Sequence, residues 1–445
     1  MTKQFYINTM GCQMNVYDSE QMALRLNAAG YTQTEDQAAA DVIILNTCSI
    51  RDKAEQKVYS FLGRLRPLKD ANPGLIIAVG GCVAQQEAQK VLKRIPYVDL
   101  VFGTRAVPRL TEHLERIGRT RRQIVDTAME DDELIPEPLL AESALGEVSR
   151  FVTIMRGCDN FCSYCVVPYV RGREKSRTPE SILAEVNDLV AKGVAEVTLL
   201  GQNVNSYGAK EGLCSFSELL RKINDVEGLK RLRFTTSHPK DFNDDVINAF
   251  TMLPKLCHHI HLPVQSGSTA VLARMNRKYT RDDYLAKVRK LRAVCPDMAL
   301  TTDIIVGFPG ETGEDFLQTL ALLEEVRYDG LFAFMYSDRS VAPAAKFPDK
   351  VPPEVKSERL QRLLELQERL TRGKNEALVG TVQEVLVEGR NSQVATGPAQ
   401  WSGRTGTNKI VHFEADGALT IMPGMLAKIK IDRALSHSLL GKLTA

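Results

Sequence analysis

The chain has 445 residues, of which 44% are hydrophobic and 25% are charged, and its formal net charge is +2. This length allows about three domains, and this composition argues against a disordered or fibrous protein. No apolar run approaches the ~18 residues that a bilayer span requires, and the N-terminus lacks a signal-peptide core. We therefore expect a cytoplasmic protein without a membrane partner, whose nine cysteines are thiols or metal ligands.

Residues 1–120 alternate short β-rich runs with helical periodicity, as βαβ units do. The expected strands are 5–8, 42–45 and 75–79, and the expected helices are 19–29, 54–65 and 84–94. This order predicts an α/β domain with a doubly wound parallel sheet. Residues 121–147 follow as an expected acidic linker, because 126–147 contain eight acidic residues and no basic one.

One cysteine follows each expected strand of this first domain. Cys12, Cys48 and Cys82 lie two to four residues beyond a strand, and glycine precedes Cys12 and Cys82 directly. The carboxyl ends of parallel strands share one edge of the sheet, where ligands bind. A lone buried cysteine is usually only a small hydrophobic residue. Three at equivalent positions instead predict a second group of three thiolate ligands.

Residues 148–378 are expected to form one domain with a closing helix. Six strands are expected at 151–155, 196–200, 231–235, 258–261, 299–305 and 331–336, and the closing helix at 354–378. Six βα units predict an open parallel barrel, whose chemistry gathers at the carboxyl ends of the strands. The loops there are rich in glycine, proline and amide side chains, and they contain the candidate cofactor-binding residues Gly201, Gln202, Asn203, Gln265, Gly307 and Pro309.

The loop after the first of these strands carries Cys158, Cys162 and Cys165 with the spacing C-x3-C-x2-C. Three thiolates can hold three irons of a [4Fe-4S] cluster and leave the fourth iron open to a small molecule. Zinc is the alternative, but a closed zinc site needs a fourth ligand. No second C-x2-C or H-x3-H pair follows within the next 40 residues. Tyr164, before the last cysteine, also favours the cluster.

Other candidate ligands and basic groups have weaker signals. Cys214, Cys257 and Cys295 lack a partner spacing, so we expect structural roles. His258, His259 and His261 point to different faces of an expected strand, which argues against a three-histidine metal site. Arg171, Arg173, Lys175 and Arg177 follow the cysteine loop and favour contact with an anionic substrate. A second basic group, from Arg274 to Arg292, is equally well explained as a helix surface.

Residues 379–443 contain short β-rich runs broken by glycines. Such runs predict a small antiparallel β-barrel of the kind that binds single-stranded nucleic acid. The side chains that could contact bases and phosphates are Trp401, Arg404, Lys409, Phe413, Lys428 and Lys430. A tryptophan in so small a domain can equally belong to the core.

The cysteine loop 158–165 resembles the signature of radical S-adenosylmethionine (SAM) enzymes, in which Tyr164 would contact the cofactor. The order of a three-cysteine domain, this barrel and a terminal β-barrel is similar to the methylthiotransferase family, whose last module is called TRAM. Within the family, the motifs at 11–15, 160–173 and 403–409 resemble the branch that acts on N6-(dimethylallyl)adenosine at tRNA position 37, beside the anticodon.

The resemblance implies two [4Fe-4S] clusters. Cys158, Cys162 and Cys165 would bind the cluster that cleaves SAM, and Cys12, Cys48 and Cys82 would bind an auxiliary cluster that carries sulfur. The implied enzyme takes hydrogen from C2 of the adenine by a radical and transfers a methylated sulfur there. It implies a tRNA partner, an electron donor and a sulfur donor of unknown identity, and we expect a monomer.

Three rival functions remain open at this stage. Other branches of the family methylthiolate threonylcarbamoyl-adenosine in tRNA or an aspartate of a ribosomal protein. A different class of protein, a non-enzymatic RNA-binding protein with structural zinc in the cysteine loops, would also fit the cysteine spacing. Zinc and iron differ in colour and oxygen sensitivity, so metal analysis separates this last alternative from the enzymes.

Overall fold

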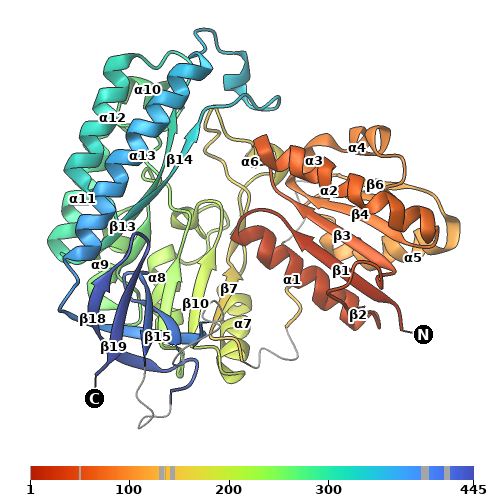
Figure 1. Ribbon diagram of the computed structural model, residues 1–445, viewed down its shortest axis with the longest axis horizontal. Helices are drawn as coiled ribbons and strands as arrows, with labels where there is room; N and C mark the ends of the chain where they lie inside the picture. The colour runs from red at the N-terminus through yellow and green to blue at the C-terminus, as the bar shows by residue number, and fades with distance from the viewer. Residues whose placement is uncertain are drawn as a thin grey trace.

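The computed structural model describes residues 2–49, 52–129, 135, 137–140, 146–391, 400–414 and 421–444. Residues 130–134, 136 and 141–145 of the expected acidic linker lie outside these ranges. Along the chain, an N-terminal sheet domain, a half barrel and a small closed barrel follow one another (Figure 1).

The N-terminal domain contains a six-stranded parallel sheet with the order β2-β1-β3-β4-β5-β6. Its strands are β1 (Gln4–Thr9), β2 (Thr32–Gln33), β3 (Val42–Thr47), β4 (Ile76–Gly81), β5 (Leu100–Phe102) and β6 (Ile124–Asp126). The direction of winding reverses between β1 and β3, and such a reversal is where doubly wound sheets bind ligands. The predicted doubly wound sheet is confirmed, and β6 lies beyond the expected domain end at residue 120.

Helices cover both faces of this sheet. The helices are α1 (Gln13–Ala28), α2 (Asp52–Ala71), α3 (Cys82–Glu87), α4 (Gln89–Arg94) and α5 (Leu110–Thr120), with the short helix η1 (Val107–Arg109) before α5. Ile44 packs with α1 and α5 on one face, whereas Ile43 and Leu45 pack with α2, α3 and α4 on the other. This alternation is what a strand buried on both faces requires.

Two helix boundaries differ from the prediction. α1 begins directly after Cys12, earlier than the expected start at residue 19. The expected helix 84–94 is divided into α3 and α4 by Ala88, whose φ is +45°. α3 also begins at Cys82, two residues before the expected start, so α1 and α3 each have their N-terminus at a cysteine.

The central domain is an open half barrel of six parallel strands. Its two sheets have the orders β11-β10-β7 and β12-β13-β14, and a parallel bridge between Leu232 and Leu256 joins them. The strands are β7 (Ser149–Thr153), β10 (Glu196–Leu200), β11 (Arg231–Phe234), β12 (His259–His261), β13 (Ala299–Val306) and β14 (Gly330–Met335). The predicted open barrel is confirmed.

Helices pack around the outside of the half barrel (Figure 1). They are α7 (Pro179–Ala191), α8 (Phe216–Asn224), α9 (Asp244–Met252), α10 (Thr269–Arg274), α11 (Arg281–Val294), α12 (Gly313–Val326) and α13 (Pro353–Glu376), with short turns η2 (Val204–Ser206) and η3 (Pro343–Lys346). Thr280 and Thr312 cap α11 and α12 in reciprocal capping boxes, which fix where these helices begin. α13 is the expected closing helix, and its Leu363 and Leu366 join the core.

The short antiparallel strands β8 (Met155–Arg156) and β9 (Lys175–Ser176) frame the loop that carries Cys158, Cys162 and Cys165. A one-turn helix, α6 (Val167–Val170), follows the last cysteine and leads back to β9. This frame holds the loop at the carboxyl end of β7, on the side of the half barrel that meets the N-terminal domain (Figure 1).

The C-terminal domain is a closed five-stranded barrel with the order β15-β16-β17-β19-β18. Its strands are β15 (Val382–Arg390), β16 (Gln400–Thr405), β17 (Ile410–Glu414), β18 (Leu426–Ala434) and β19 (Ser438–Leu443). The predicted small barrel is confirmed, although β17 and β19 pair in parallel and only the other neighbours are antiparallel.

This barrel packs against the amino ends of the half-barrel strands. Arg231, the first residue of β11, donates to the Arg404 carbonyl at 2.5 Å, and Lys230 donates to the Gly424 carbonyl at 2.7 Å. Asp329, just before β14, forms an ion pair with Lys409 at 3.3 Å. The small barrel and the cysteine loops therefore lie at opposite ends of the parallel strands. In the described part of the chain, no helix has the length and apolar character needed to span a membrane.

Candidate functional site

Cys12, Cys48 and Cys82 lie at the carboxyl ends of three neighbouring strands, β1, β3 and β4. Cys48 and Cys82 are buried, Cys12 is half-buried, and all three are free thiols. A hydrogen bond between the Cys12 and Cys48 thiols is the main reason that the pKa of Cys12 falls to about 6, even though burial acts to raise it. The sheet thus brings together the cysteines that the sequence assigns to one group, and one of them favours the thiolate.

Two glycines allow these cysteine loops to approach one another. Gly11 has φ +145°, and a Cβ there would lie 2.5 Å from the Cβ of Cys48. Gly81 has φ +89°, and a Cβ there would overlap the carbonyl of Thr47. The glycines before Cys12 and Cys82 are therefore required by close packing between the loops.

A buried pair of asparagines joins the same loops. The amide nitrogen of Asn15 donates to the side-chain oxygen of Asn46 and to the carbonyl of Thr47, both at 3.0 Å. Asn46 in turn donates to the carbonyl of Asn15 at 2.9 Å and to Ser19 at 2.9 Å. Since both amides are satisfied by the protein, they set the position of the loops and do not present free groups to a ligand.

The second cysteine group, Cys158, Cys162 and Cys165, lies on the loop between β8 and β9. Burial raises the pKa of Cys158 to about 11 and that of Cys165 to about 12. These thiols are protonated at neutral pH in the absence of metal. Metal binding at this loop must therefore release protons.

The loop is attached to the end of α10. Ser163 donates its amide to the carbonyl of Met275 at 3.0 Å and its hydroxyl to the carbonyl of Arg274 at 2.8 Å. Asn276, just beyond α10, donates to the Phe161 carbonyl at 2.9 Å. These bonds fix the cysteine loop to the half barrel.

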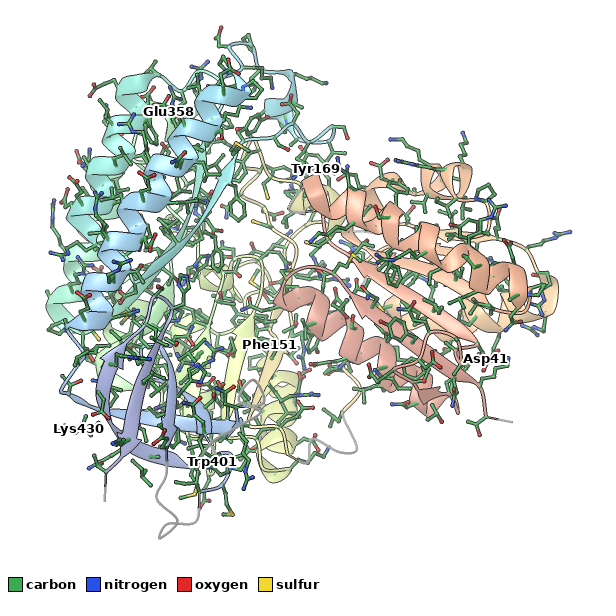
Figure 2. All side chains as sticks on the ribbon, in the orientation of Figure 1. Asp41, Phe151, Tyr169, Glu358, Trp401 and Lys430 are labelled. Carbon is green, nitrogen blue, oxygen red and sulfur yellow. The ribbon has the colours of Figure 1, made fainter. Side chains whose placement is uncertain are left out.

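The two cysteine groups are neighbours in space. Cys82 packs with Val166, which directly follows Cys165, and with Val170, the last residue of α6. Arg171 forms a 2.8 Å ion pair with Asp18 of α1 and a hydrogen bond with the Cys82 thiol. The chain thus places the two groups on either side of α6. Tyr169, at the end of α6, lies where the two domains meet (Figure 2).

The candidate cofactor residues lie in the loops at the carboxyl ends of the strands, and several also have structural partners. Gln202 accepts a hydrogen bond from the Gly157 amide at 2.5 Å. Asn203 is buried, and its side chain bonds to Ser206 and Asp241. Tyr164 is half-buried against Phe308 and Tyr336.

The remaining candidates are held mainly through the backbone. Gly201 packs on Met155, and a Cβ at Gly201 would lie 2.5 Å from the Met155 Cγ. Gln265 has φ +73° and exchanges backbone hydrogen bonds with β13. The Gly307 amide donates to Glu311 at 2.8 Å, and Pro309 follows within the same turn.

Two side chains that the sequence did not identify as site residues contact Cys162. Arg277 Nη1 lies 3.4 Å from the Cys162 sulfur, and His238 Nε2 lies 3.9 Å from it. Arg277 was expected in a basic group on helix surfaces, but it lies in the turn between α10 and α11 and is 4% exposed. His238 lies in the loop after β11, one of the strand-end loops expected to form the rim of the site, although its own role was not predicted.

The spacing of the sulfur atoms bears on which metal could fit. A tetrahedral zinc ion with Zn–S bonds of ~2.3 Å needs sulfurs ~4 Å apart. Among the described residues, the only trio of histidine, cysteine or carboxylate ligand atoms within 4.8 Å of one another is His258, Cys295 and Asp297. Neither cysteine group is that compact. Each group offers three cysteine sulfurs, which is the donor set of a [4Fe-4S] cluster with one iron left open.

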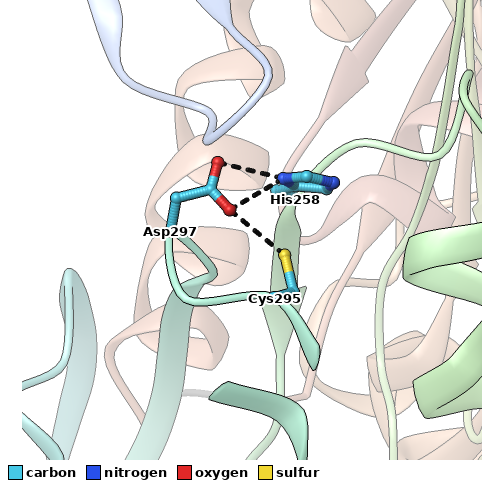
Figure 3. Close-up of side chains that lie close together, drawn as sticks. All are labelled: His258, Cys295 and Asp297. Atoms are coloured by element: carbon cyan, nitrogen blue, oxygen red, sulfur yellow. Dashed lines mark hydrogen bonds and ion pairs between the residues drawn. The ribbon is translucent and has the colours of Figure 1, made fainter. Parts of the chain in front are cut away.

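His258, Cys295 and Asp297 lie at the amino ends of β12 and β13, away from the cysteine loops (Figure 3). His258 Nδ1 lies 3.0 Å from Asp297, and the Cys295 thiol donates to the same carboxylate at 3.3 Å. The His258 side chain is half-buried and the Asp297 side chain is exposed. The contacts join the start of β12 to the turn before β13, which agrees with the structural role expected for Cys295.

The basic residues after the second cysteine loop are mostly paired with carboxylates. Arg171 and Arg177 are buried and pair with Asp18 and Glu185. These ion pairs neutralise both guanidinium groups, and their contact with an anionic substrate stays a prediction. Arg173 is half-exposed and pairs with Asp159 at 3.2 Å.

The residues of the C-terminal barrel that were predicted to contact nucleic acid differ in their exposure. Phe413 is fully buried in the barrel core, so its proposed contact with bases is wrong. Trp401 is half-buried at the edge of that core, with Arg390 5.6 Å from its ring. Lys428 and Lys430 alternate with buried residues on β18 and point outward; Trp401 and Lys430 are seen on the barrel in Figure 2.

A pocket lies between α1 and the half barrel. Its lining comes from both domains and includes Met14, Arg105, Thr153, Arg156 and Arg171. Arg156 directly precedes the second cysteine loop, and Met14 follows Cys12. The pocket is therefore bounded by residues next to both cysteine groups.

Comparison with known families divides the chain in the same three parts. Residues 4–103 match a family described as "Uncharacterized protein family UPF0004", residues 152–323 match the Radical SAM superfamily, and residues 376–444 match the TRAM domain. Among solved structures, the radical S-adenosylmethionine methyltransferase TsrM from Kitasatospora setae is similar, with a TM-score of 0.57 and 14% identity over 89% of this chain and 80% of that chain. At this identity, the likeness concerns the fold alone.

Curated relatives are much closer in sequence. A tRNA-2-methylthio-N(6)-dimethylallyladenosine synthase from Desulfosudis oleivorans is 53% identical over 99% of this chain and 96% of its own length. A protein of the same name from Geobacter metallireducens is 53% identical over 99% of this chain and 98% of its own length. The chain therefore belongs to the family of tRNA-2-methylthio-N(6)-dimethylallyladenosine synthases, within the radical SAM superfamily.

Proposed function

We propose that this chain methylthiolates N6-(dimethylallyl)adenosine at position 37 of tRNA, beside the anticodon, and gives the 2-methylthio product. One observation carries the proposal most directly: Cys82 of one cysteine group packs against Val166 and Val170, which follow the other group. A reaction that needs a radical source and a sulfur source at one substrate requires two such groups in proximity. The full-length similarity to relatives that bear this enzyme name supports the choice of substrate.

In this proposal, Cys158, Cys162 and Cys165 hold a [4Fe-4S] cluster that binds SAM, and Cys12, Cys48 and Cys82 hold an auxiliary [4Fe-4S] cluster. When bound, these groups supply a 5′-deoxyadenosyl radical and the sulfur that is transferred. C2–H of an aromatic base is too inert for acid–base removal, which is why a radical is needed. The three free thiols of each group match the three thiolate ligands of such a cluster.

Residues at the rim of the half barrel would position SAM. Tyr164, Gly201, Gln202, Asn203, Gln265, Gly307 and Pro309 are the proposed contacts. Gln202 is oriented by the Gly157 amide, and the Gly307 turn is held by Glu311, which accepts from Arg359 at 2.6 Å. Buried and paired in this way, Glu311 keeps the turn rigid so that its backbone can approach a ligand.

The pocket between α1 and the half barrel is the proposed place for the adenine. Five arginines line it, namely Arg25, Arg105, Arg156, Arg171 and Arg177. A base in a loop leaves its stack at lower cost than a paired base, which suits a nucleotide next to the anticodon. The outward Lys428 and Lys430 of the TRAM barrel would contact RNA phosphates.

The remaining assignments follow from this reaction. A tRNA substrate places the protein in the cytoplasm, where a one-electron donor and a sulfur donor must serve it. We propose that it works as a monomer, with the N-terminal domain at 1–120, the linker at 121–147, the radical SAM domain at 148–378 and the TRAM barrel at 379–443.

The test is an assay of anaerobically purified, iron-loaded protein with SAM and a chemical reductant. We expect about eight irons per chain and methylthio product on tRNA that carries N6-(dimethylallyl)adenosine. Parallel reactions contain tRNA with threonylcarbamoyl-adenosine and the ribosomal protein. Product on either of these, and none on the first, would overturn the substrate assignment. A colourless, zinc-containing protein would overturn the reaction itself.

A further inference from the structure

Arg277 is a buried cation at the cysteine loop of the half barrel. It is 4% exposed, and all three of its guanidinium nitrogens are used. Nε donates to the Tyr279 hydroxyl at 2.9 Å, and Nη2 donates to the Pro263 carbonyl at 2.7 Å. Nη1 faces the Tyr164 hydroxyl at 3.3 Å and the Cys162 sulfur at 3.4 Å. The side chain is therefore fixed in one orientation.

No carboxylate among the described residues forms an ion pair with Arg277, unlike the buried Arg171, Arg177 and Arg359. The carbonyl of Pro263 carries no net charge. The hydroxyls of Tyr164 and Tyr279 are neutral at pH 7, because an ordinary phenol has a pKa of about 10. A buried guanidinium without a negative partner is costly, because desolvation is not offset by attraction.

Cys162 is the one acceptor of Arg277 that can become an anion. Its thiol loses its proton when it binds iron, which creates the missing negative charge next to the guanidinium. Arg277 is thus positioned for a state in which Cys162 is a thiolate. This step rests on the proposed function, because it requires that the loop holds an iron cluster.

His238 supplies a second donor to the same sulfur. Its Nδ1 accepts from the Lys240 amide at 3.2 Å, so the proton of the neutral ring lies on Nε2. Nε2 is 3.9 Å from the Cys162 sulfur. The fixed positive charge of Arg277, on the other side of the same sulfur, disfavours a second positive charge on this ring. The sulfur is therefore flanked by one charged and one neutral donor.

We infer that Arg277 is the counter-charge of the SAM-binding cluster and that, with His238, it raises the reduction potential of this cluster through the Cys162 sulfur. Reduction adds one electron from an external low-potential donor to a centre that already carries three thiolates. A fixed positive charge beside a thiolate stabilises the more negative, reduced state, as do hydrogen bonds to the sulfurs. Arg277 and His238 are positioning residues, since they act through a ligand.

The test compares the midpoint potential of this cluster in full-length, iron-loaded variants. The titration is followed by electron paramagnetic resonance, and the cluster is identified by the change in its signal when SAM is added. In Arg277→Gln, we expect the cluster to be at least tenfold harder to reduce, which corresponds to a shift of about 59 mV to lower potential. Arg277→Lys keeps the positive charge, so its cluster should have a midpoint potential close to that of the unaltered protein.

Two further variants complete the comparison. Lys278→Gln removes the same charge at the next residue, which is exposed, and should leave the potential unchanged. His238→Leu removes the neutral donor and should shift the potential in the same direction as Arg277→Gln, but less. Circular dichroism and iron content establish that each variant is folded and loaded.

The inference is overturned if loaded Arg277→Gln has the potential of the unaltered protein, or if Arg277→Lys shifts as far as Arg277→Gln. If Arg277→Gln does not retain iron, the midpoint potentials of Arg277→Lys and His238→Leu test the inference instead. A near-normal potential in the first and a lowered one in the second support the inference, and any other pair of results overturns it. Failure of the proposed function is distinct, because no SAM-responsive iron–sulfur signal would then exist in any variant.

Discussion

Arg171 of the half barrel lies 2.8 Å from Asp18 of α1, and this buried ion pair joins the two domains that carry the cysteine groups. Removing one partner leaves the other charge buried and unpaired, which costs about 3–5 kcal/mol. We expect Asp18→Asn to lower the free energy of unfolding by about that amount, measured by urea denaturation. Asp70→Asn breaks an exposed pair with Arg66 and should change it by only about 0–1 kcal/mol. Equal effects of the two variants would contradict a stabilising role for the buried pair.

The two cysteine groups should have separable roles. Cys158→Ala is expected to abolish 5′-deoxyadenosine formation from SAM, because the cluster that binds SAM loses a ligand. Cys48→Ala is expected to retain that cleavage but to form no methylthio product, and each variant should lose about half of the iron. Chromatography of the nucleosides and iron analysis provide the measurement. Cys214→Ala, at a half-buried cysteine outside both groups, is the control and should retain both activities.

Gly11 tests whether close packing holds the first cysteine group together. Gly11→Ala forces a Cβ to within 2.5 Å of Cys48 at φ +145°, which L side chains rarely adopt. We expect a loss of stability of about 1–3 kcal/mol and reduced iron at the auxiliary site. Gly63→Ala is the matched control, because Gly63 is exposed within α2 and has no heavy atom within 4 Å of a new Cβ. That variant should be more stable by about 0.5–1 kcal/mol. A well-loaded, stable Gly11→Ala protein would refute the packing argument.

Asp126 should make stability depend on pH in the acid range. Partial burial acts to raise the pKa of this carboxyl, but hydrogen bonds from Arg109 at 2.8 Å and His113 at 2.7 Å outweigh it and lower the pKa. A depressed pKa stabilises the fold above the unfolded value of about 3.9, and this contribution is lost as the pH falls through the folded value. Asp126→Asn should therefore be less stable than the unaltered protein at pH 6, and this difference should be smaller at pH 3, below the unfolded pKa. Urea denaturation at both pH values measures this, and a constant difference would contradict the assignment.

Lys428 and Lys430 test the RNA contact of the TRAM barrel. The double change to glutamine should weaken tRNA binding and reduce the slope of log affinity against log salt by about 1 for each lost phosphate contact. Cleavage of SAM should be unaffected, because β18 lies at the other end of the strands. Lys222→Gln, on the outer face of α8, serves as the control. Unchanged salt dependence in the double variant would place the RNA elsewhere.

Much of the fold follows from local patterns in the sequence. Strands such as β10 and β13 begin and end within a residue or so of the predicted limits, because runs rich in aliphatic and β-branched residues mark strands. The gathering of Cys12, Cys48 and Cys82 is also predictable, because the carboxyl ends of parallel strands meet at one edge. Strand order alone was enough to predict that these three cysteines lie at one edge of the sheet.

Features that depend on distant partners were not predictable in the same way. Arg277 has the composition of an exposed helix residue, and only the fold reveals that Pro263 and Cys162 surround it. Arg171 is neutralised by Asp18, which lies 153 positions earlier in the chain. The start of α1 at Gln13 was missed because Cys12 is not a usual helix cap and makes no side-chain capping bond.

The attachment of the small barrel to the amino ends of the strands limits which RNA molecules can be held securely. β13 has eight residues, so the two ends of the half barrel are separated by roughly 26 Å at about 3.3 Å per residue. A free nucleoside can reach only the cysteine end. An RNA hairpin with several base pairs below its loop is long enough to touch both, so we expect such a hairpin to bind more tightly than a free nucleoside.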